Sequence, residues 1–243
     1  MRNHVISHHS SSLLAIFAHP DDETYRAGGT LALLAESGVS VQVLTATRGQ
    51  AGSCGDPPLC IPEELANMRE NELICACAAL GIEPPILLDY QDGHLAEVDR
   101  ETIITEILAL IEDLRPQVIL TFGQDGLSGH PDHIAIGEYA AEAYRLSNRV
   151  DALYTLAVPQ SIADTLGMSQ IHAVPDCKIT LKVDVSSSWE SKKKAIQCHA
   201  TQLSSSPINR APLERQLLFL GSEHFVLSSE RKPHRFFSDL TGV

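Results

Sequence analysis

The first 150 residues alternate between short apolar segments and longer segments with helical periodicity, and this alternation restricts the fold more than any other feature of the chain. Strands that are apolar throughout and separated by helices form parallel sheets with helices on both faces. The sequence therefore predicts an α/β fold, a Rossmann-like three-layer sandwich with a mostly parallel sheet. The expected strands lie at residues 13–18, 39–47, 85–89 and 117–122, and the expected helices at 25–36, 63–80, 99–114 and 132–146.

The last third of the chain is less regular and is interpreted as a set of additions to this core. No internal repeat and no linker divides the 243 residues. A chain of this length fits one large domain, so we predict a single domain over residues 1–243, with the core in 1–150 and C-terminal additions in 151–243. In the additions we expect strands at 152–157 and 178–185, a weak helix at 161–168 and a helix at 187–202.

The charge of the chain bears on its partners. With 31 acidic and 18 basic residues, the formal net charge is −13, which repels phosphate backbones and anionic membrane surfaces. The apolar run Leu13–Ala18 is too short to span a bilayer or to act as a secretory core. We therefore expect a cytoplasmic protein with no membrane span and no nucleic-acid partner; a homo-oligomer stays open.

The six cysteines form no C-x-x-C pair, so we expect no disulfide framework. Cys54 and Cys60 flank a short loop and are interpreted as free thiols rather than as a bridge or a zinc knuckle. Cys75 and Cys77 fall in an alanine-rich helical segment, where cysteines are ordinary packing residues.

Other polar residues outside any motif are expected at the surface. The basic run Lys192–Lys194 is interpreted as a solvated helix face. Histidines without a partner pattern are expected on the surface or in loops, namely His4, His8, His9, His172, His224 and His234.

Acidic and imidazole side chains collect directly after the predicted strands, where open α/β sheets bind their ligands. The segment HPDD, residues 19–22, follows the first strand, and the segment HPDH, residues 130–133, follows the fourth. Either segment alone is equally compatible with a structural role, as a proline turn or as a capped helix start. Together, at one edge of one sheet, they would bury several like charges, which is costly unless a cation is bound. The two segments therefore predict a metal site.

Two imidazoles and one carboxylate are typical of a catalytic zinc site with a fourth position left for water. His19 and Asp22 are three residues apart in a tight turn, so both side chains can converge with that of His133. We therefore predict His19, Asp22 and His133 as the ligands of Zn²⁺, with Fe²⁺ as another possible metal. A non-haem iron(II) oxygenase uses the same ligand types and is a competing interpretation.

The remaining side chains of the two segments suggest hydrolysis by a zinc-activated water. Asp21 is the candidate base, because a carboxylate beside such a water can take its proton as it attacks a carbonyl. His130 is the candidate acid or oxyanion stabiliser. Asp132 could hold His130 in the useful tautomer, orient a metal ligand, or serve only as a helix N-cap.

In their order and spacing, four segments of the first 150 residues resemble the PIG-L/LmbE-like deacetylases. A later segment, KKKAIQCHATQ, is similar to the C-terminal helix of that family. The four segments in the first 150 residues are AHPDDE at residues 18–23, GGTL at 28–31, RENEL at 69–73 with Leu80-Gly81, and GHPDH at 129–133.

The resemblance implies a zinc-dependent hydrolase that removes acetyl from N-acetylglucosamine-type substrates, with the metal ligands, base and acid already named. It also implies that Arg69 and Asp92 face sugar hydroxyls, although Arg69 could instead pair with Glu72 one helical turn away. One departure concerns Ser128, which stands where some members carry a tyrosine that assists the oxyanion. The loop with Cys54 and Cys60 matches no family feature, and such regions usually set substrate choice.

Our leading hypothesis is thus removal of an N-acetyl group from an N-acetylglucosamine-type sugar or conjugate. One alternative is an amidase that acts on another sugar-linked amide. A second alternative, from a different class, is a metal-binding protein that has lost turnover, because a fold alone does not guarantee activity. Ser128 is the feature that points toward the second alternative.

Overall fold

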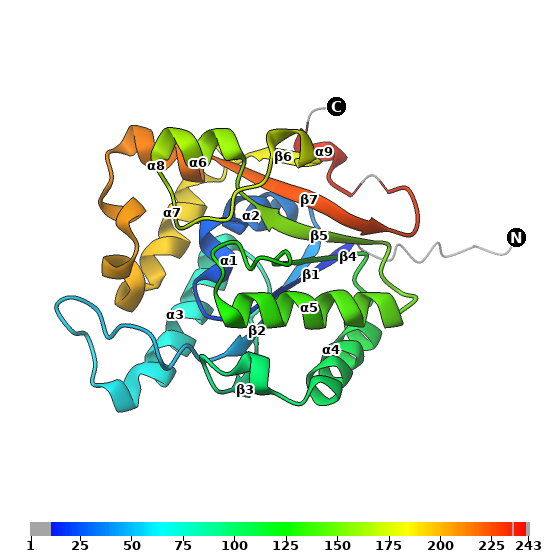
Figure 1. The fold of residues 1–243 in the computed structure, drawn as a ribbon, viewed down its shortest axis with the longest axis horizontal. Helices are drawn as coiled ribbons and strands as arrows, with labels where there is room; N and C mark the ends of the chain where they lie inside the picture. Colours follow the sequence, from blue (N-terminus) through cyan, green and yellow to red (C-terminus); the bar gives the residue numbers. More distant parts are fainter. Residues whose placement is uncertain (1–10, 235, 242–243) are drawn as a thin grey trace, which may run out of the picture.

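The protein was analysed as a computed structural model, which describes residues 11–234 and 236–241. Its strands form one seven-stranded sheet in the order β3-β2-β1-β4-β5-β7-β6 (Figure 1). Neighbouring strands among β1 to β5 run parallel, whereas β7 is antiparallel to both β5 and β6. The sheet is thus mostly parallel, as predicted. The strands are β1 Ser12–Phe17, β2 Ser40–Thr47, β3 Ile86–Tyr90, β4 Val118–Thr121, β5 Ala152–Ala157, β6 Leu181–Asp184 and β7 Ser222–Glu230.

Two groups of helices pack with the sheet. Helices α4 and α5 pack against each other and contact β1, while α2, α3 and α7 pack together. This arrangement confirms the expected α/β class, and the expected helices of the first 150 residues are all present. The helices are α1 Asp22–Tyr25, α2 Gly28–Glu36, α3 Leu65–Leu80, α4 Arg100–Leu114, α5 Pro131–Leu146, α6 Gln160–Leu166, α7 Trp189–Cys198, α8 Leu213–Leu220 and α9 Ser238–Thr241.

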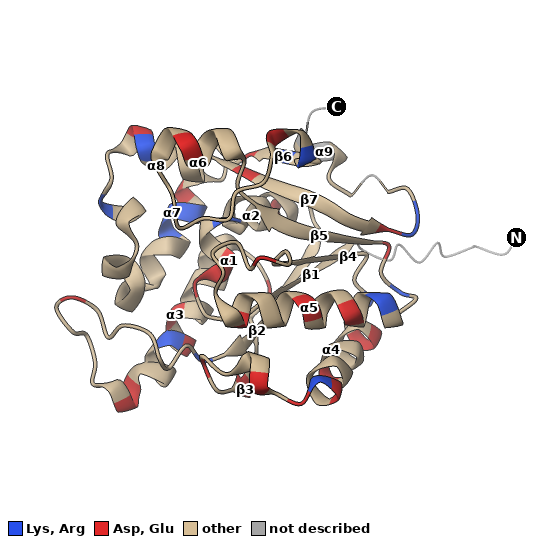
Figure 2. Cartoon of the chain, in the orientation of Figure 1, with Lys and Arg blue, Asp and Glu red and all other residues tan. Residues whose placement is uncertain are grey.

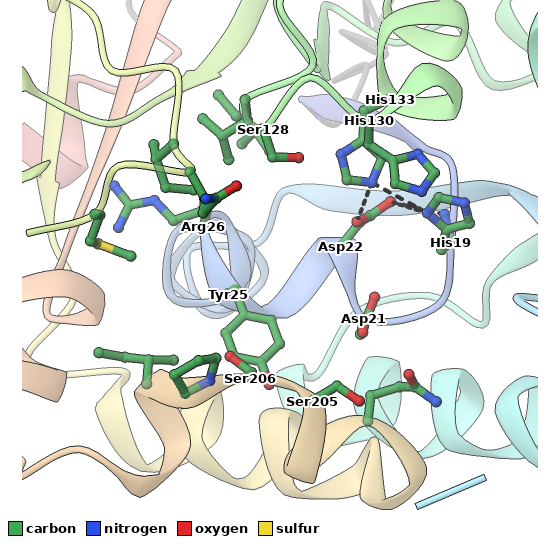
Figure 3. A pocket seen from close by; sticks show the side chains of 18 of the residues that line it. His19, Asp21, Asp22, Tyr25, Arg26, Ser128, His130, His133, Ser205 and Ser206 are labelled. Carbon is green, nitrogen blue, oxygen red and sulfur yellow. Dashed lines mark hydrogen bonds and ion pairs between the residues drawn. The ribbon is translucent and has the colours of Figure 1, made fainter. Parts of the chain in front are cut away.

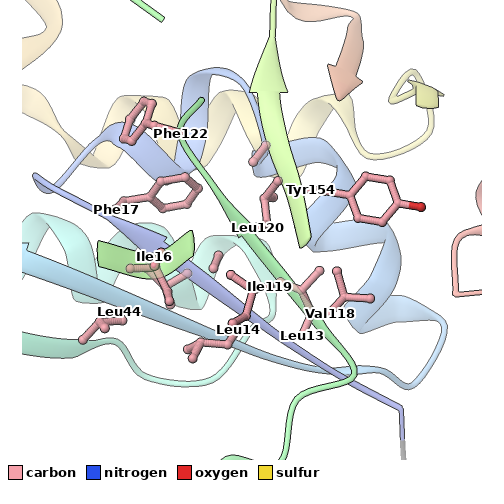
Figure 4. Packing of buried hydrophobic residues seen from close by; sticks show 14 of the residues in the cluster. Leu13, Leu14, Ile16, Phe17, Leu44, Val118, Ile119, Leu120, Phe122 and Tyr154 are labelled. Atoms are coloured by element: carbon pink, nitrogen blue, oxygen red, sulfur yellow. The ribbon is translucent and has the colours of Figure 1, made fainter. Parts of the chain in front are cut away.

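The main hydrophobic core lies around β1 in the middle of the sheet. Because helices cover both of its faces, the side chains from Leu13 to Phe17 are all buried, which explains why this strand is apolar without alternation. They pack beside Val118 and Leu120 of the neighbouring strand β4 (Figure 4).

Strands β1 and β4 are adjacent and parallel, with Leu13 paired to Val118 and Ala15 to Leu120. Their carboxyl ends therefore reach the same edge of the sheet. The HPDD segment follows β1 and the HPDH segment leads into α5 after β4. Two motifs more than 100 residues apart in the sequence are brought side by side by this pairing.

One expected helix and one strand differ from the sequence-based prediction. The helix expected at residues 25–36 is divided into α1 and α2, and the amides of Gly29 and Thr30 at the start of α2 donate to the carboxylate of Glu223, at 2.9 and 2.7 Å. Glu223 belongs to β7, which the sequence did not predict. Its buried polar residues, Glu223 and His224, interrupt the apolar pattern by which strands are recognised.

Two expectations about surface residues were wrong. The side chain of Lys192 is completely buried, and its Nζ donates to Glu223 Oε1 and to the carbonyl of Leu220, both at 2.7 Å. His224 is also buried, whereas His172 is exposed as expected. The partners of Lys192 lie on α8 and β7, far away in the sequence, so local pattern gave no sign of them. His4, His8 and His9 lie outside the described residues.

The expectation about disulfides was also wrong in one respect. Cys75 of α3 and Cys198 of α7 form a disulfide across 123 residues of sequence. Cys75 is therefore not a packing residue, although Cys77 is buried as expected. Cys54 and Cys60 are free thiols, as predicted.

Acidic residues recur along α4 and α5 (Figure 2). Within the described part of the chain, no helix is both long enough and apolar enough to cross a membrane.

Candidate metal centre

The HPDD segment forms a tight turn at the end of β1. The amide of Asp22 donates to the carbonyl of His19, and the Asp22 carboxylate accepts hydrogen bonds from the amides of His19 and Ala18 at 2.8 and 3.1 Å. This return of the chain places the His19 and Asp22 side chains on the same side, as the three-residue spacing predicted. Between them, Asp21 has a φ of 104°, a conformation that non-glycine residues adopt rarely.

The three predicted ligands converge in the structure (Figure 3). His19 Nδ1 lies 3.2 Å from His133 Nε2, which lies 3.2 Å from Asp22 Oδ1. Asp22 Oδ2 lies 3.7 Å from His19 Nδ1. Two ligands bound at zinc distances in tetrahedral geometry are about 3.3 Å apart. The spacing of these donor atoms therefore fits a single bound cation.

The hydrogen bonds of the two imidazoles leave the converging nitrogens free to bind a metal. His133 Nδ1 lies 3.1 Å from the carbonyl oxygen of Gly126, to which it can only donate. His19 Nε2 lies 3.1 Å from carboxylate oxygens of both Asp92 and Asp132. The other two nitrogens, His19 Nδ1 and His133 Nε2, then have lone pairs that face each other. A cation between them removes this repulsion. A metal-ligating histidine characteristically donates its second nitrogen to an oxygen in this way.

The electrostatics of the cluster also favour positive charge at this point. Burial works against a charge on His19, but its hydrogen bonds to Asp132 and Asp92 and the charge of Asp22 raise the pKa of His19 to about 10. Burial likewise works against the charge of Asp22, yet His133 and His19 lower the pKa of Asp22 below its usual range. The carboxylates therefore stay ionised and attract a proton or a metal ion.

Asp132 and Asp92 support His19 from the side opposite Asp22. The Asp132 carboxylate is fully buried and accepts hydrogen bonds from the amides of Gly93 and Leu95, at 2.7 and 3.0 Å. Of the roles considered for Asp132, the contacts thus favour orientation of a metal ligand. It does not cap α5, because the N-cap is His130, whose Nδ1 accepts from the Asp132 amide at 3.2 Å.

His19, Asp92 and Asp132 also form a group whose oxygens and nitrogen lie close enough to hold a metal. Both carboxylates, however, are already engaged by backbone amides, because Asp92 Oδ2 accepts from Ala51 at 2.9 Å. Asp92 Oδ1 contacts His19 Nε2, and Asp92 also lines the cavity, so the expectation that it faces sugar hydroxyls stays a prediction. This second group is better explained as the support of the first.

Arg69 links two loops beside Asp21. Its buried guanidinium donates to the carbonyls of Gly49 and Pro20 and lies 3.5 Å from Asp21 Oδ1. The alternative ion pair with Glu72 is not formed. Glu72 instead accepts two hydrogen bonds from Thr201, at 2.8 Å from its amide and 2.7 Å from its hydroxyl.

The cluster lies in the wall of a cavity of about 980 Å³. Asp21, Asp92, Arg69, His130 and Ser128 also line this cavity. Burial raises the pKa of Asp21 to about 6, with the positive charge of Arg69 opposing the rise. His130 is the most exposed of the three histidines, and burial together with the charges of His133 and His19 lowers its pKa.

Sequence reasoning missed a buried pair, Glu23 and His199, that supports the backbone of Asp21. His199 Nε2 lies 2.6 Å from Glu23 Oε1, and Glu23 Oε2 accepts from the amide of Asp21 at 3.0 Å. Both side chains of the pair are fully buried. Glu23 and His199 each stand in a segment that carries the resemblance, and this was the available signal.

With the geometry established, comparison with known proteins identifies the family. The family model described as "PIG-L: GlcNAc-PI de-N-acetylase" matches residues 14–144, which cover β1 to α5 and both halves of the ligand cluster. The chain belongs to the PIG-L family.

Curated members of the PIG-L family extend the match into the C-terminal third. A 1D-myo-inositol 2-acetamido-2-deoxy-α-D-glucopyranoside deacetylase from Acidothermus cellulolyticus is 32% identical over 232 residues, covering 79% of this chain and 80% of that protein. The enzyme of the same name from Mycobacteroides abscessus is 32% identical over 254 residues, covering 88% and 91% of the two chains.

Solved structures support the fold. The N,N'-diacetylchitobiose deacetylase of Pyrococcus horikoshii has a TM-score of 0.65 at 20% identity and covers 89% of this chain and 83% of its own. GalB, the 4-carboxy-2-hydroxymuconate hydratase of Pseudomonas putida KT2440, has a TM-score of 0.68 at 21% identity and covers 92% and 98%. Because a hydratase and a deacetylase share this fold, the fold by itself does not determine the reaction.

Proposed function

We propose that this PIG-L protein is a metal-dependent N-deacetylase that releases acetate from an N-acetylglucosamine-type sugar or conjugate. The observation that carries the proposal is the convergence of His19 Nδ1, His133 Nε2 and Asp22 Oδ1 beside the carboxylate of Asp21. The names of the curated relatives support an amide of an N-acetylated amino sugar as the substrate.

We propose Zn²⁺ as the metal, held by His19, Asp22 and His133. Two neutral imidazole nitrogens and one carboxylate are the donor set that zinc accepts in hydrolytic sites. When bound, such a cation acidifies water and polarises an amide carbonyl. The support for zinc is the donor chemistry, and ferrous iron is the alternative metal that the same donors accept.

Asp21 is proposed as the general base. Its carboxylate lines the cavity next to the ligand Asp22, and desolvation raises its pKa to about 6, close to neutral pH. A base is most effective when its pKa lies near the pH at which it works. Asp21 would take a proton from the attacking water, while Arg69 and the amide contact to Glu23 hold its position.

His130 is proposed to stabilise the oxyanion. Because its Nδ1 accepts a hydrogen bond from the amide of Asp132, the neutral imidazole carries its proton on Nε2. The lowered pKa keeps the ring neutral near pH 7. Nε2–H is then available to donate a hydrogen bond where negative charge develops.

A product assay tests the proposal. The metal-free protein, prepared by chelation, is loaded with Zn²⁺ or with Fe²⁺ and given a panel of N-acetylated glucosamine derivatives. We expect acetate and a free amine in equal amounts, lost on chelation and restored by zinc.

The alternatives give different results in the same assay. An oxygenase needs Fe²⁺ and dioxygen and releases no acetate. A binding protein without turnover takes up zinc and leaves every derivative intact. Acids other than acetate as the main product would indicate an amidase for another sugar-linked amide.

A further inference from the structure

The cavity beside the metal centre has two chemically different ends. Figure 3 shows the histidines on one side and Arg26 and Tyr25 away from them. Beside Tyr25 and Arg26, the cavity is lined by a group of apolar side chains, which we call the apolar wall. The apolar wall consists of Leu127, Leu166, Met168, Ile171, Ile208 and Phe219.

The apolar wall belongs to a second hydrophobic cluster, although Leu127 also packs against the main core. Its buried members, Leu166 and Phe219, belong to a second hydrophobic cluster beneath α6 and α8. Met168, Ile171 and Ile208 are only partly buried and pack on that cluster from the cavity side. Apolar surface that converges in a cavity is characteristic of ligand sites, where it is covered when the ligand binds.

Two arginines line the cavity near the apolar wall, and both donate to backbone carbonyls. The guanidinium of Arg26 donates to the carbonyls of Phe219 and Ala157, and that of Arg215 donates to the carbonyl of Leu166 at 2.6 Å. The Arg26 side chain is buried, so its guanidinium is held in place by these backbone contacts. Among the described residues, the acids lining the cavity are Asp21, Asp22 and Asp92, all at the metal end. The far end therefore suits an uncharged, apolar group.

The size of the cavity is the second independent observation. Its volume of about 980 Å³ is at the upper end of the range of roughly 300–1,000 Å³ that holds drug-sized ligands. One N-acetylated amino sugar at the metal centre leaves the apolar end unfilled. A substituent on that sugar is needed to cover the apolar wall.

We propose that the apolar wall binds an apolar aglycone, an aryl or alkyl group carried by the N-acetylglucosamine unit whose acetyl group is removed. This proposal rests on the proposed function, because removal of acetyl places the small acyl group at the metal centre. The apolar group must then be part of the aglycone rather than of the acyl chain.

A series of glycosides tests the proposal with the unmodified, zinc-loaded protein. Acetate release is measured for the methyl, hexyl and phenyl N-acetylglucosaminides. Burial of a hexyl or phenyl group on the apolar wall should raise kcat/KM by about 10- to 100-fold over the methyl glycoside. Equal kcat/KM values across the series would overturn the proposal. So would a preference for N-hexanoylglucosamine over the phenyl N-acetylglucosaminide.

Substitutions on the apolar wall test whether the preference for the phenyl glycoside arises there. Met168→Asp and Ile208→Asp each place a charge on the apolar wall, and each should reduce the phenyl-to-methyl ratio of kcat/KM to near one. Leu213→Asp is the matched control, because Leu213 lies on α8 with 60% of its surface exposed and does not line the cavity. The control should keep the ratio of the parent protein. A ratio unchanged in both folded wall variants contradicts the proposal.

Calorimetry separates this proposal from the proposed function. The affinity and the heat-capacity change are measured for binding of the phenyl and methyl N-acetylglucosaminides to the zinc-loaded protein, and neither quantity depends on acetate release. We expect tighter binding of the phenyl glycoside and a more negative heat-capacity change. If no acetate is released but the phenyl glycoside binds more tightly, the proposed function fails and the apolar site stands. Equal affinities overturn the apolar site whatever the activity.

Discussion

The two loops at the ends of β1 and β4 and the C-terminal third contribute to the same cavity in different ways. The candidate metal ligands, the base and the oxyanion donor lie in the HPDD segment directly after β1 and in the HPDH segment at the start of α5. The C-terminal third carries none of these groups. It supplies the apolar wall except for Leu127, the buried His199 beside Glu23, and Glu223, which accepts from the first amides of α2.

All the proposed reacting groups thus come from the first 150 residues, whereas part of their support comes from the C-terminal third. A change in the loops should remove a reacting group, whereas a change in the C-terminal third should move or loosen one. Disulfide Cys75–Cys198 and the Glu72–Thr201 contacts tie the end of α7 and the residues after it to α3. Substitutions in the two regions should therefore differ in their effects on activity, zinc content and stability.

The largest effect is expected when a metal ligand is removed. His133→Ala and Asp22→Ala should lower zinc content and reduce acetate release below detection, because each deletes one of three donors. Metal analysis after dialysis and the acetate assay measure both effects. His94→Ala is the control, since His94 is exposed in the loop after β3 and pairs with Glu97. A His133→Ala protein that keeps one zinc per chain would show that the ligand set is wrong.

The next largest effect is expected at the base. Asp21→Asn should retain zinc and lower kcat by about 10²- to 10⁴-fold, the contribution typical of general base catalysis. Asp89→Asn serves as the matched control, because Asp89 is an exposed carboxylate at a strand end and pairs with Arg48. Near-normal turnover of Asp21→Asn would assign the base elsewhere.

A smaller effect on activity is expected from the C-terminal third. His199→Ala leaves the buried Glu23 carboxylate without its imidazole partner, so the free energy of unfolding should fall by about 3 kcal/mol. Because Glu23 holds the amide of Asp21, kcat should fall about tenfold, in the range of one hydrogen bond to a charged group, while zinc is retained. His172→Ala, at an exposed site, is the control. Loss of zinc in His199→Ala would place His199 among the metal ligands and contradict the division between the two regions.

The smallest effect at neutral pH is expected at His224. Burial and the nearby charge of Arg26 lower the pKa of His224 to about 4, from an ordinary value of 6.5. The unfolded chain then binds a proton more readily than the folded one between these pH values. The stability is fully present above pH 6.5 and is lost as the pH falls toward 4.

His224→Gln should remove this part of the acid destabilisation, which amounts to at most about 3 kcal/mol over that interval. Urea unfolding of the metal-free protein at a series of pH values provides the measurement. Identical pH profiles for the variant and its parent would show that His224 does not contribute.

The sequence predicted the features that depend on residues close together in the chain, such as buried strands and tight turns. The run Leu13–Ala18 is apolar because β1 is buried on both faces, and the turn of HPDD follows from the spacing of His19 and Asp22. Parallel strands place both motifs at one edge of the sheet, so the ligand cluster could be expected before its geometry was known.

The parts that sequence reasoning missed depend on partners that lie far apart in the chain. Lys192 resembles an ordinary exposed lysine until β7 places Glu223 against it, and Cys75 is unremarkable until α7 delivers Cys198. Asp132 could be assigned to His19 rather than to His130 only when both distances were known.

The amino-acid sequence alone was enough to predict the strands and helices of the first 150 residues, the family and a set of candidate metal ligands, because these features follow from periodicity and from side-chain types at local spacings. Only the tertiary structure decided which nitrogen of each imidazole is free, which groups brace Asp21, and that one end of the cavity is apolar. Those properties arise from contacts between distant segments, and the free energy of such contacts depends on distance and burial rather than on neighbouring residues in the chain.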